Sequence, residues 1–317
     1  MSISTASWVE TFCAEYLDEF IRDGGATVKF VVGDADERKA VEEGLAREGA
    51  ARGYIAAHVD GAVVKLHMVE EFFFAVARRI DWLRLANSVR TRVVSENGYS
   101  MANGDVTFAG IAHQTGIELY EVRNEIQRAF SRDVFRDYAM TQEFRLAMMR
   151  FCLDPMSNVN QGDGGMTDLL EDWLRGDIRL ASAMKPALIY QKITRHNARD
   201  MLVSLSHWVR LAGEAGMIIT VDISAYLART RAMVAEGASY YTRAATMDLY
   251  EALRQFVDSI DELEGVAIVV AAAPEFLTDD DRGLRMYRAL EARVAEEVRD
   301  RIRDNPVAGL IRVGGVV

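Results

Sequence analysis

A phosphate-binding loop is the first chemistry that the sequence offers, in the residues TVKFVVGDADERKA from Thr27 to Ala40. A strand-like apolar run leads into Gly33, and Lys39 follows six positions later, which is the spacing of the motif G-x-x-x-x-G-K-[ST]. In a working loop, backbone N–H groups close around the phosphates, the lysine reaches the outer phosphates and the next hydroxyl holds Mg²⁺. Here Arg38 replaces the second glycine and Ala40 replaces the hydroxyl residue. The motif therefore keeps its spacing but lacks the second glycine and the hydroxyl group that would hold Mg²⁺.

Three carboxylates in the same stretch oppose a bound nucleotide. Asp34, Asp36 and Glu37 stand where phosphate oxygens would lie. Like charges a few ångströms apart in a partly desolvated site repel by about 4 kcal/mol at an effective dielectric constant of about 20. We therefore expect a degenerate loop that binds neither ATP nor Mg²⁺. The alternative interpretation is an unrelated strand, turn and helix, which recur in many α/β proteins.

An aspartate at the end of another apolar run has the position of a Walker B residue. The run MIITVD ends at Asp222, which in a nucleotide-hydrolysing enzyme would hold the water shell of Mg²⁺, with a glutamate beside it to polarise the attacking water. The next residue here is Ile223, and the later run 266–271 leads into alanines where a polar sensor residue would be expected. The alternative for Asp222 is a cap for a helix from Ser224. We expect no catalytic residue at this site.

The composition is that of a globular protein with an acidic balance. The 317 residues are 50% hydrophobic, and Asp and Glu outnumber Lys and Arg by 48 to 37, giving a formal net charge of −11. A generic affinity for nucleic-acid phosphates is therefore not expected of the whole molecule, although a local basic patch is compatible with this charge. Cys13 and Cys152 fit buried free thiols of a cytoplasmic protein. No ligand pattern for a metal and no membrane-spanning segment are evident.

Apolar runs and helical patterns together predict the fold. Near-continuous apolar strands flanked by helices indicate a parallel sheet covered on both faces. The expected strands are 28–32, 54–59, 217–221, 266–271 and 310–313. Since ligand sites lie at the carboxyl ends of such strands, we expect Gly33–Lys39 and Asp222 at the same edge of the sheet.

Three regions follow from this pattern. Residues 1–65 are expected to hold an N-terminal helix and the first part of the core, and residues 214–317 the second part. Between them, residues 66–213 are almost entirely helical in pattern and are expected to form a long all-helical insertion.

Four stretches are distinctive enough to compare with known families: FVVGD at 30–34, VRNEIQRAFSRDVFRDYAMTQEFRLAMMRFC at 122–152, KPALIYQKITRHNARDMLVSLSHWVRLAGEAGMIITVD at 185–222 and ALRQFVDSIDELEGVAIVVAAAPEFLTDDDRGLRMYRAL at 252–290. Together they resemble the BREX-system ATP-binding domain proteins, AAA+-like P-loop ATPases of bacterial anti-phage defence islands that work with other defence components. The resemblance implies an α/β P-loop NTPase fold of the AAA+/ASCE-like type. Family members commonly continue past the last core strand, whereas this chain stops at Val317, so we expect no obvious C-terminal lid domain.

The resemblance also implies a surface that faces a neighbouring subunit. In AAA+ assemblies an arginine from the adjacent subunit completes the nucleotide site. The segment after the fourth strand carries four candidates, Arg282, Arg285, Arg288 and Arg293. The alternative is an exposed amphipathic helix whose arginines alternate with acids. The expected partner is a second copy of the chain or an ATPase-competent component of the same defence system.

A helix-turn-helix pattern covers residues 108–130. Within it Arg123, Asn124, Gln127 and Arg128 could contact DNA from a second helix. The acidic composition and the place of this segment inside the helical region favour an ordinary packing unit.

Two functions of different classes account best for these features. The first is a catalytically degenerate pseudo-ATPase that serves as an assembly or regulatory subunit of a defence complex beside an ATPase or DNA-processing partner, with contact to DNA possible through that complex. The second is an active ATPase with an unusual loop, which would bind ATP and Mg²⁺. Loss of the second glycine, the Mg²⁺ hydroxyl and the water-polarising acid favours the first. A third hypothesis is a DNA-binding regulator that uses the helix-turn-helix pattern.

Overall fold

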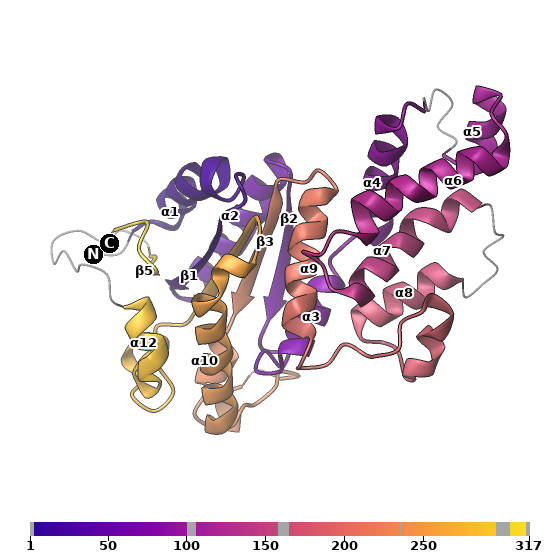
Figure 1. The fold of residues 1–317 in the computed structure, drawn as a ribbon. Helices are drawn as coiled ribbons and strands as arrows, with labels where there is room; N and C mark the ends of the chain where they lie inside the picture. The colour runs from indigo at the N-terminus through magenta and orange to yellow at the C-terminus, as the bar shows by residue number, and fades with distance from the viewer. Residues whose placement is uncertain (1–2, 100–105, 158–164, 235, 296–304, 315–317) are drawn as a thin grey trace. The chain divides into compact units, whose positions relative to one another are not determined.

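The computed structural model describes residues 3–99, 106–157, 165–234, 236–295 and 305–314 (Figure 1). Two compact units are formed, one from residues 1–79 and 214–317 and the other from residues 80–213. We call them the sheet unit and the helical unit. The sequence pattern placed the start of the helical region at residue 66, whereas helix α3 (Val69–Ala77) lies in the sheet unit. Its Phe72 ring contacts the ring of Phe256 at a centroid distance of 5.4 Å.

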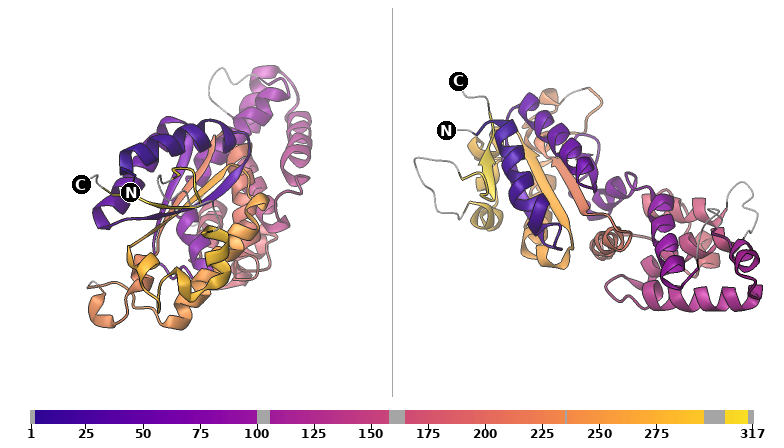
Figure 2. Two further views of the ribbon diagram at one scale, coloured as in Figure 1. Left: turned by 90° about the vertical axis from the view of Figure 1, so that its left-hand side faces the viewer. Right: turned by 90° about the horizontal axis from the view of Figure 1, so that it is seen from above.

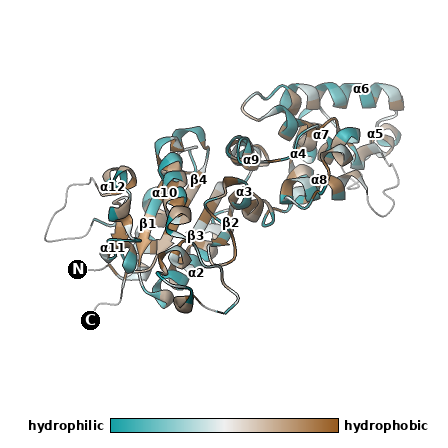
Figure 3. Ribbon diagram, turned by 90° about the horizontal axis from the view of Figure 1, so that it is seen from below, coloured by the Kyte–Doolittle hydropathy of each residue, from teal (hydrophilic) through white to brown (hydrophobic). Residues whose placement is uncertain are grey.

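The sheet unit contains one parallel sheet with the strand order β2-β3-β4-β1-β5. Each strand coincides with a predicted apolar run to within about two residues, so the predicted five-stranded parallel sheet is confirmed. The inner strands β3 and β4 are buried along nearly their whole length, as expected for strands covered on both faces, and Figure 3 shows β1 and β3 largely on the hydrophobic side of its colour scale. The strands are β1 (Ala26–Val32), β2 (Tyr54–Asp60), β3 (Gly216–Asp222), β4 (Val266–Ala272) and β5 (Leu310–Arg312).

Helices cover both faces of this sheet (Figure 2, left). On one face lie α1 (Thr5–Phe12), the π-helical turn η1 (Cys13–Phe20) and α2 (Ala35–Ala51). They bury Trp8, Phe12 and Leu45 together with strand residues such as Val31 and Ile218. The other face is covered by α3 and by segments from the second half of the chain, and aromatic side chains of these segments pack toward β1. Burial of these apolar surfaces, at roughly 25 cal/mol per Å², is the main stabilising contribution.

The face opposite α2 is built around stacked aromatic rings. Phe30 of β1 stacks on Phe276 of α11 (Glu275–Thr278) at 6.0 Å, and Tyr250 of α10 (Arg243–Asp258) meets the same ring edge-on at 5.8 Å. Short 3₁₀ turns and one helix complete this side: η5 (Ser224–Leu227), η6 (Arg231–Met233), η7 (Ile260–Glu262), η8 (Leu284–Met286) and α12 (Arg288–Val294).

Both described ends of the chain meet at the outer strand of the sheet. The Ile3 N–H donates to the carbonyl oxygen of Arg312 at 3.1 Å, and the Gly314 N–H donates to the carbonyl oxygen of Ile3 at 3.0 Å. The backbone of Ile3 thereby pairs with β5 beyond its short strand and covers part of its exposed edge.

The helical unit has a core of its own. Trp82 packs against Phe144 and Phe151 at centroid distances of 6.1 and 6.4 Å. Cys152 lies fully buried beside them as a free thiol, and burial raises its pKa to about 12. The unit comprises α4 (Trp82–Glu96), α5 (Phe108–Thr115), α6 (Leu119–Phe130), the π turn η2 (Ser131–Phe135), α7 (Gln142–Leu153), η3 (Pro155–Ser157), α8 (Met166–Arg175), η4 (Ala181–Ala187) and α9 (Ala198–Leu211). Among the described residues, no helix is long and apolar enough to cross a membrane.

Candidate nucleotide site

The loop after β1 consists of only two residues, Gly33 and Asp34, because α2 begins at Ala35. Asp34 is the N-cap: its Oδ1 accepts the Glu37 N–H at 3.0 Å, and its carbonyl oxygen accepts the Arg38 N–H at 3.0 Å. The Glu37 N–H, one of the donors that a phosphate-binding loop would turn toward a nucleotide, is thus taken by the cap. The carboxylate of Asp34 occupies the helix N-terminus, where an anion would otherwise be favoured.

Gly33 is required by packing. Its φ angle is not among the positive values found at nine other glycines, so the left-handed region is not the reason for glycine here. A Cβ atom at this position would lie 2.9 Å from Cγ2 of Val313 and 2.9 Å from Cβ of Glu37. The glycine therefore lets the start of α2 and the residue after β5 approach closely, which accounts for it without a phosphate.

Arg38 and Asp222 meet at the carboxyl edge of the sheet, as expected from the parallel strands. Arg38 Nε lies 3.0 Å from Asp222 Oδ2, and Arg38 Nη1 donates to the carbonyl oxygen of Gly33 at 2.9 Å. The other carboxylate oxygen, Oδ1, accepts the Ser224 N–H at 2.7 Å. The two side chains are only 14% and 24% exposed. Both oxygens of the candidate Walker B carboxylate are therefore engaged, and a guanidinium supplies the positive charge that Mg²⁺ would supply in a working site.

Lys39 and Ala40 lie on the outward side of α2. The Lys39 side chain is 72% exposed, and its Nζ lies 3.6 Å from Oε1 of Glu43, one turn along the helix. Ala40 is exposed as well, whereas Val41 is 1% exposed and faces the core. Because the helix starts immediately after Asp34, Arg38 is the residue of the loop motif that pairs with Asp222, and Lys39 lines the cavity beside this pair. That positions 38 to 40 belong to one nucleotide site stays a prediction.

A small cavity of about 190 Å³ adjoins Arg38 between α2 and the sheet. Its polar lining comprises Arg38, Lys39, Glu42, His58, Asp60, Thr220 and Asp222. His58 Nδ1 lies 3.0 Å from Thr220 Oγ1 and 3.4 Å from Glu42 Oε2. Asp60 is in register with Asp222 on the neighbouring strand. Ligand pockets usually measure about 300 to 1,000 Å³, so this one is small for a nucleotide. Its three carboxylates, Glu42, Asp60 and Asp222, outnumber the cations Arg38 and Lys39, so the lining carries no excess of positive charge for phosphates.

Sequence reasoning missed the lining residues Glu42, His58, Asp60 and Thr220. The signal was present: His58 and Asp60 alternate along β2, so both point to one face of the sheet. No group of metal-binding geometry occurs among the His, Cys, Asp and Glu residues that the structure describes.

The two remaining catalytic positions carry apolar side chains. Ile223 is fully buried, and its N–H donates to the carbonyl oxygen of Ala271 at 2.9 Å. β4 lies between β1 and β3, so its end is the place for a residue that senses the outer phosphate. The residues there are alanines, Ala271 to Ala273. They can neither polarise a water nor donate a hydrogen bond from a side chain.

The model of the family described as BREX system ATP-binding protein BrxC/D matches residues 13–315. This chain belongs to that family. The match spans nearly the whole chain and confirms the resemblance seen in its sequence segments. Comparisons with curated proteins and with solved structures find no match. Membership makes the chain a component of a multi-protein BREX defence system, and the family as described binds ATP.

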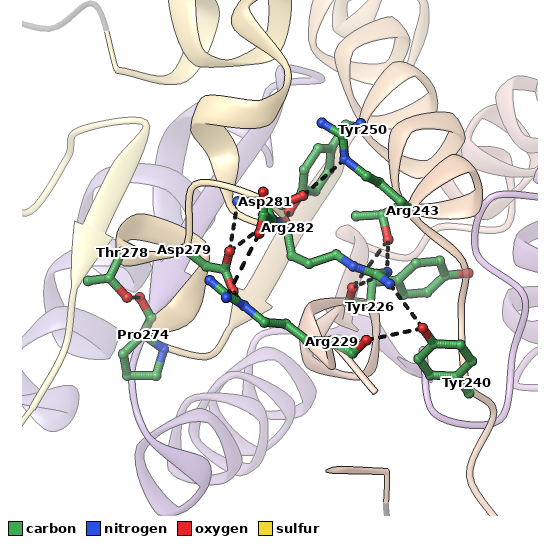
Figure 4. Close-up of polar contacts among 11 residues, drawn as sticks. Tyr226, Arg229, Tyr240, Arg243, Tyr250, Pro274, Thr278, Asp279, Asp281 and Arg282 are labelled. Carbon is green, nitrogen blue, oxygen red and sulfur yellow. Dashed lines mark hydrogen bonds and ion pairs between the residues drawn. The ribbon is translucent and has the colours of Figure 1, made fainter. Parts of the chain in front are cut away.

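Among the four arginines considered for a neighbouring subunit's site, Arg282 is 6% exposed (Figure 4). Its Nη1 donates to the carbonyl oxygen of Tyr241 and to Oγ1 of Thr246, both at 3.0 Å, and Nη2 donates to the Tyr240 hydroxyl at 3.3 Å. The Tyr250 hydroxyl donates to the Arg282 carbonyl oxygen at 2.6 Å. Because these acceptors belong to the same chain, the Arg282 guanidinium is not available to a nucleotide of a neighbouring subunit. Arg282 is thus a structural residue of this BrxC/D family member.

A carboxylate at the start of the same segment organises this loop. Asp279 Oδ1 accepts the N–H groups of Asp281 and Arg282 at 2.8 and 3.1 Å, and Oδ2 accepts Arg229 Nε at 2.6 Å. The hydrogen bond from Arg229 holds the pKa of Asp279 below its usual value. The segment that follows β4 is therefore held in place from within.

The other three arginines are more open. Arg288 is 83% exposed in its side chain and pairs with Glu291 at 2.9 Å, and Arg285 is 63% exposed and pairs with Asp280 at 3.4 Å. Arg293 is 38% exposed and pairs with Asp258. Exposed pairs of this kind contribute about 0 to 1 kcal/mol and can open at little cost, so Arg285 and Arg288 are the most available to a partner.

The helix-turn-helix pattern has the expected local structure. α5 ends at Gly116, whose φ of 71° is left-handed, and α6 follows from Leu119. Arg123 lies over the ring of Phe108 at 5.7 Å. Arg123 and Arg128 are exposed, whereas Asn124 and Gln127 are half-buried. Contact with DNA through these four residues stays a prediction.

Proposed function

We propose that this BrxC/D family member is a pseudo-ATPase of AAA+-like fold, an assembly or regulatory subunit whose nucleotide site is filled by its own side chains. The ion pair between Arg38 and Asp222 carries this proposal. In an active site the carboxylate would need a free oxygen toward the Mg²⁺ water shell. Here Arg38 and the Ser224 N–H take both oxygens.

The start of α2 supports the same conclusion. A phosphate cradle needs several residues of loop between strand and helix so that successive N–H groups converge on the anion. Gly33 and Asp34 are too short a connection for that, and Asp34 presents a negative charge at the place where phosphate would bind. Binding of ATP by the BREX complex would then be a property of another component.

We infer a role in assembly because the chain keeps the α/β fold of the family but lacks the side chains that nucleotide hydrolysis needs. The partner would be a second copy of this chain or an ATPase-competent component of the system. Arg285 and Arg288 are the arginines most able to reach a neighbour's nucleotide. An arginine that contacts charge developing in the transition state affects turnover more than nucleotide binding.

Calorimetric titration of the purified chain with Mg-ATP tests the proposal. We expect no binding with a dissociation constant below about 1 mM, that is, less than about 4 kcal/mol of binding free energy. Asp222→Asn serves as the matched control, because it removes the carboxylate charge at constant shape. A micromolar dissociation constant that Asp222→Asn weakens tenfold or more would instead establish a working nucleotide site, and release of phosphate from ATP by the wild type and not by Asp222→Asn would then establish the active ATPase.

A second experiment, on the reconstituted BREX complex, tests whether this chain donates an arginine to a partner's nucleotide site. Arg288→Ala should lower ATP turnover by tenfold or more while nucleotide affinity changes less than twofold, and Arg282→Ala should instead lower the stability of the chain itself. Full turnover in Arg285→Ala, Arg288→Ala and the double variant, with the complex intact, excludes these two residues as donors.

A further inference from the structure

A basic segment lies in the helical unit between α8 and α9. The 22 residues from Ile178 to Arg199 contain five Lys or Arg residues and no Asp or Glu, within a chain whose net charge is −11. The acids nearest in sequence are Asp177 and Asp200 at its two ends. This local charge is opposite in sign to that of the molecule as a whole, so it is not a consequence of composition.

Most of the basic and polar side chains of this segment are exposed to solvent. Arg179, Lys185, Lys192 and Arg195 are exposed, and Tyr190 is 67% exposed. Exposed hydroxyl and amide residues lie between them, namely Ser182, Gln191 and Thr194. Arginine, lysine and small hydroxyl or amide side chains are the groups that contact phosphate oxygens of nucleic acids.

Buried apolar residues hold the segment in place. Met184 and Ile189 are fully buried, Ala187 is 1% exposed and Ile193 is 6% exposed. The indole Nε1 of Trp173 donates to the carbonyl oxygen of Gln191 at 3.1 Å. These anchors alternate with the exposed cations, so the cations are presented on a fixed backbone.

A hydrogen bond joins two parts of the segment. Lys192 Nζ donates to the carbonyl oxygen of Arg179 at 2.5 Å, which brings two cationic residues thirteen positions apart together. The side-chain amide of Gln191 donates to Oε1 of Glu143 at 2.6 Å, so this neighbouring acid of α7 already has a partner. We call the exposed group Arg179, Lys185, Tyr190, Lys192 and Arg195 the basic loop.

A strained residue sits at the tip of the basic loop. Leu188 follows η4 with φ of 62° and is the single residue other than glycine with positive φ in the part of the chain that the structure describes. Its side chain is 52% exposed. Such a conformation costs about 1 kcal/mol or more in a non-glycine residue and clusters at binding sites. It reverses the chain between Lys185 and Tyr190.

We propose that the basic loop binds the sugar-phosphate backbone of a nucleic-acid strand, with Tyr190 as a stacking position for an unpaired base. Cations along a backbone together with an exposed aromatic ring form the usual surface for single-stranded nucleic acid. A run of cations with no acid between Asp177 and Asp200 suits a polyanion, which makes a nucleic-acid strand the favoured occupant.

The helix-turn-helix pattern is a weaker candidate for the same ligand. In α6 the exposed Arg123 and Arg128 are interleaved with the exposed Glu121 and Glu125, so the helix carries no excess of positive charge. The basic loop has no such compensation between its two ends.

Fluorescence anisotropy of the full chain with labelled 20-nucleotide single strands and the matching duplex tests the proposal at 50 to 200 mM salt. We expect a dissociation constant of about 1 to 100 µM for the single strand. Lys185→Glu with Arg195→Glu should weaken binding at least tenfold and lower the salt slope by about 1.4, because each phosphate contact to a single strand contributes about 0.7. Tyr190→Ala should weaken single-strand binding about tenfold and duplex binding much less.

Matched controls carry the same changes elsewhere. Arg79→Glu with Arg231→Glu alters the net charge equally at exposed positions of the sheet unit, and Tyr120→Ala removes an equally exposed tyrosine of α6. Both should bind nearly as wild type. Unchanged thermal midpoints of all variants exclude unfolding as the cause.

Three results overturn the proposal. The first is no binding by the wild-type chain at 50 mM salt. The second is equal loss in the control pair, which means that only net charge matters. The third is loss in Arg123→Glu with Arg128→Glu but not in the basic-loop variant, which assigns binding to α6. Loss of complex assembly in the basic-loop variant without nucleic-acid binding by the wild type assigns the loop to an acidic protein partner.

Discussion

The ion pair between Arg38 and Asp222 should show a coupling free energy of about 1 to 2 kcal/mol in a double-mutant cycle. At the observed 3.0 Å the Coulomb attraction is about 5.5 kcal/mol for an effective dielectric constant of about 20. Desolvation of two partly buried ions offsets most of it. With side chains 14% and 24% exposed, the pair lies between an exposed pair, worth about 0 to 1 kcal/mol, and a buried one.

Urea unfolding of wild type, Arg38→Gln, Asp222→Asn and the double variant measures this coupling. Each single variant should lose about 1 to 3 kcal/mol, because it leaves the other ion partly buried with one hydrogen bond, and the double variant should lose less than the sum. The pair Lys39 and Glu43 provides the internal control. It is 72% and 65% exposed at i,i+4 spacing, so its coupling should be about 0.3 to 0.5 kcal/mol.

A coupling for Arg38 and Asp222 no larger than that of the control pair would refute the reasoning. The same holds if 0.5 M salt abolishes it, because a pair this well covered should be screened only weakly. Either result would mean that the guanidinium does not neutralise the carboxylate in solution, and the carboxylate would then be available to a metal ion.

Three further predictions concern the surroundings of this site. Asp34→Ala removes the N-cap of α2 and should lower the free energy of unfolding by about 1 kcal/mol, while Asp34→Ser should recover most of it. Gly33→Ala forces a Cβ atom within 2.9 Å of Val313 and should cost about 1 to 3 kcal/mol in urea unfolding, and a neutral result would contradict the packing argument. His67 is half-buried against the Tyr226 hydroxyl, 2.8 Å from Nδ1, and burial lowers its pKa, so its stabilising contribution should be complete above the unfolded pKa of about 6.5 and decline as the pH falls below that value. The stability difference between wild type and His67→Asn should accordingly be larger at pH 7.5 than at pH 5.5, and a difference independent of pH would show that protonation of His67 is not coupled to folding.

The strands could be predicted because their signal is local. The inner strands β3 and β4 are nearly unbroken apolar runs, because a parallel sheet covered by helices buries both of their faces. The edge at which Arg38 and Asp222 meet followed from the same argument, because parallel strands end at one edge. These conclusions need no knowledge of side-chain direction.

The chemistry of the site could not be predicted because it depends on where a helix begins. A start at Ala35 turns Arg38 inward and Ala40 outward, and a few residues of loop would have reversed those directions. Arg282 shows the same limit: its spacing fits an exposed helix, whereas acceptors from residues about 40 to 56 positions away bury it. The basic loop was hidden by the acidic average of the whole chain.

Under the proposed function, an internal arginine stands in place of a metal ion, and this would change how the subunit behaves. In a nucleotide-dependent ATPase the carboxyl edge of the sheet alternates between occupied and empty states, and the neighbouring loops follow it. Arg38 is part of the chain, so its charge beside Asp222 is always present, and the short connection through Gly33 holds it there. A ligand shifts a conformational equilibrium only through its differential affinity for two states. A subunit whose site is permanently neutralised would therefore offer its partners one constant surface, and the timing of the complex would come from a component that still binds and releases nucleotide.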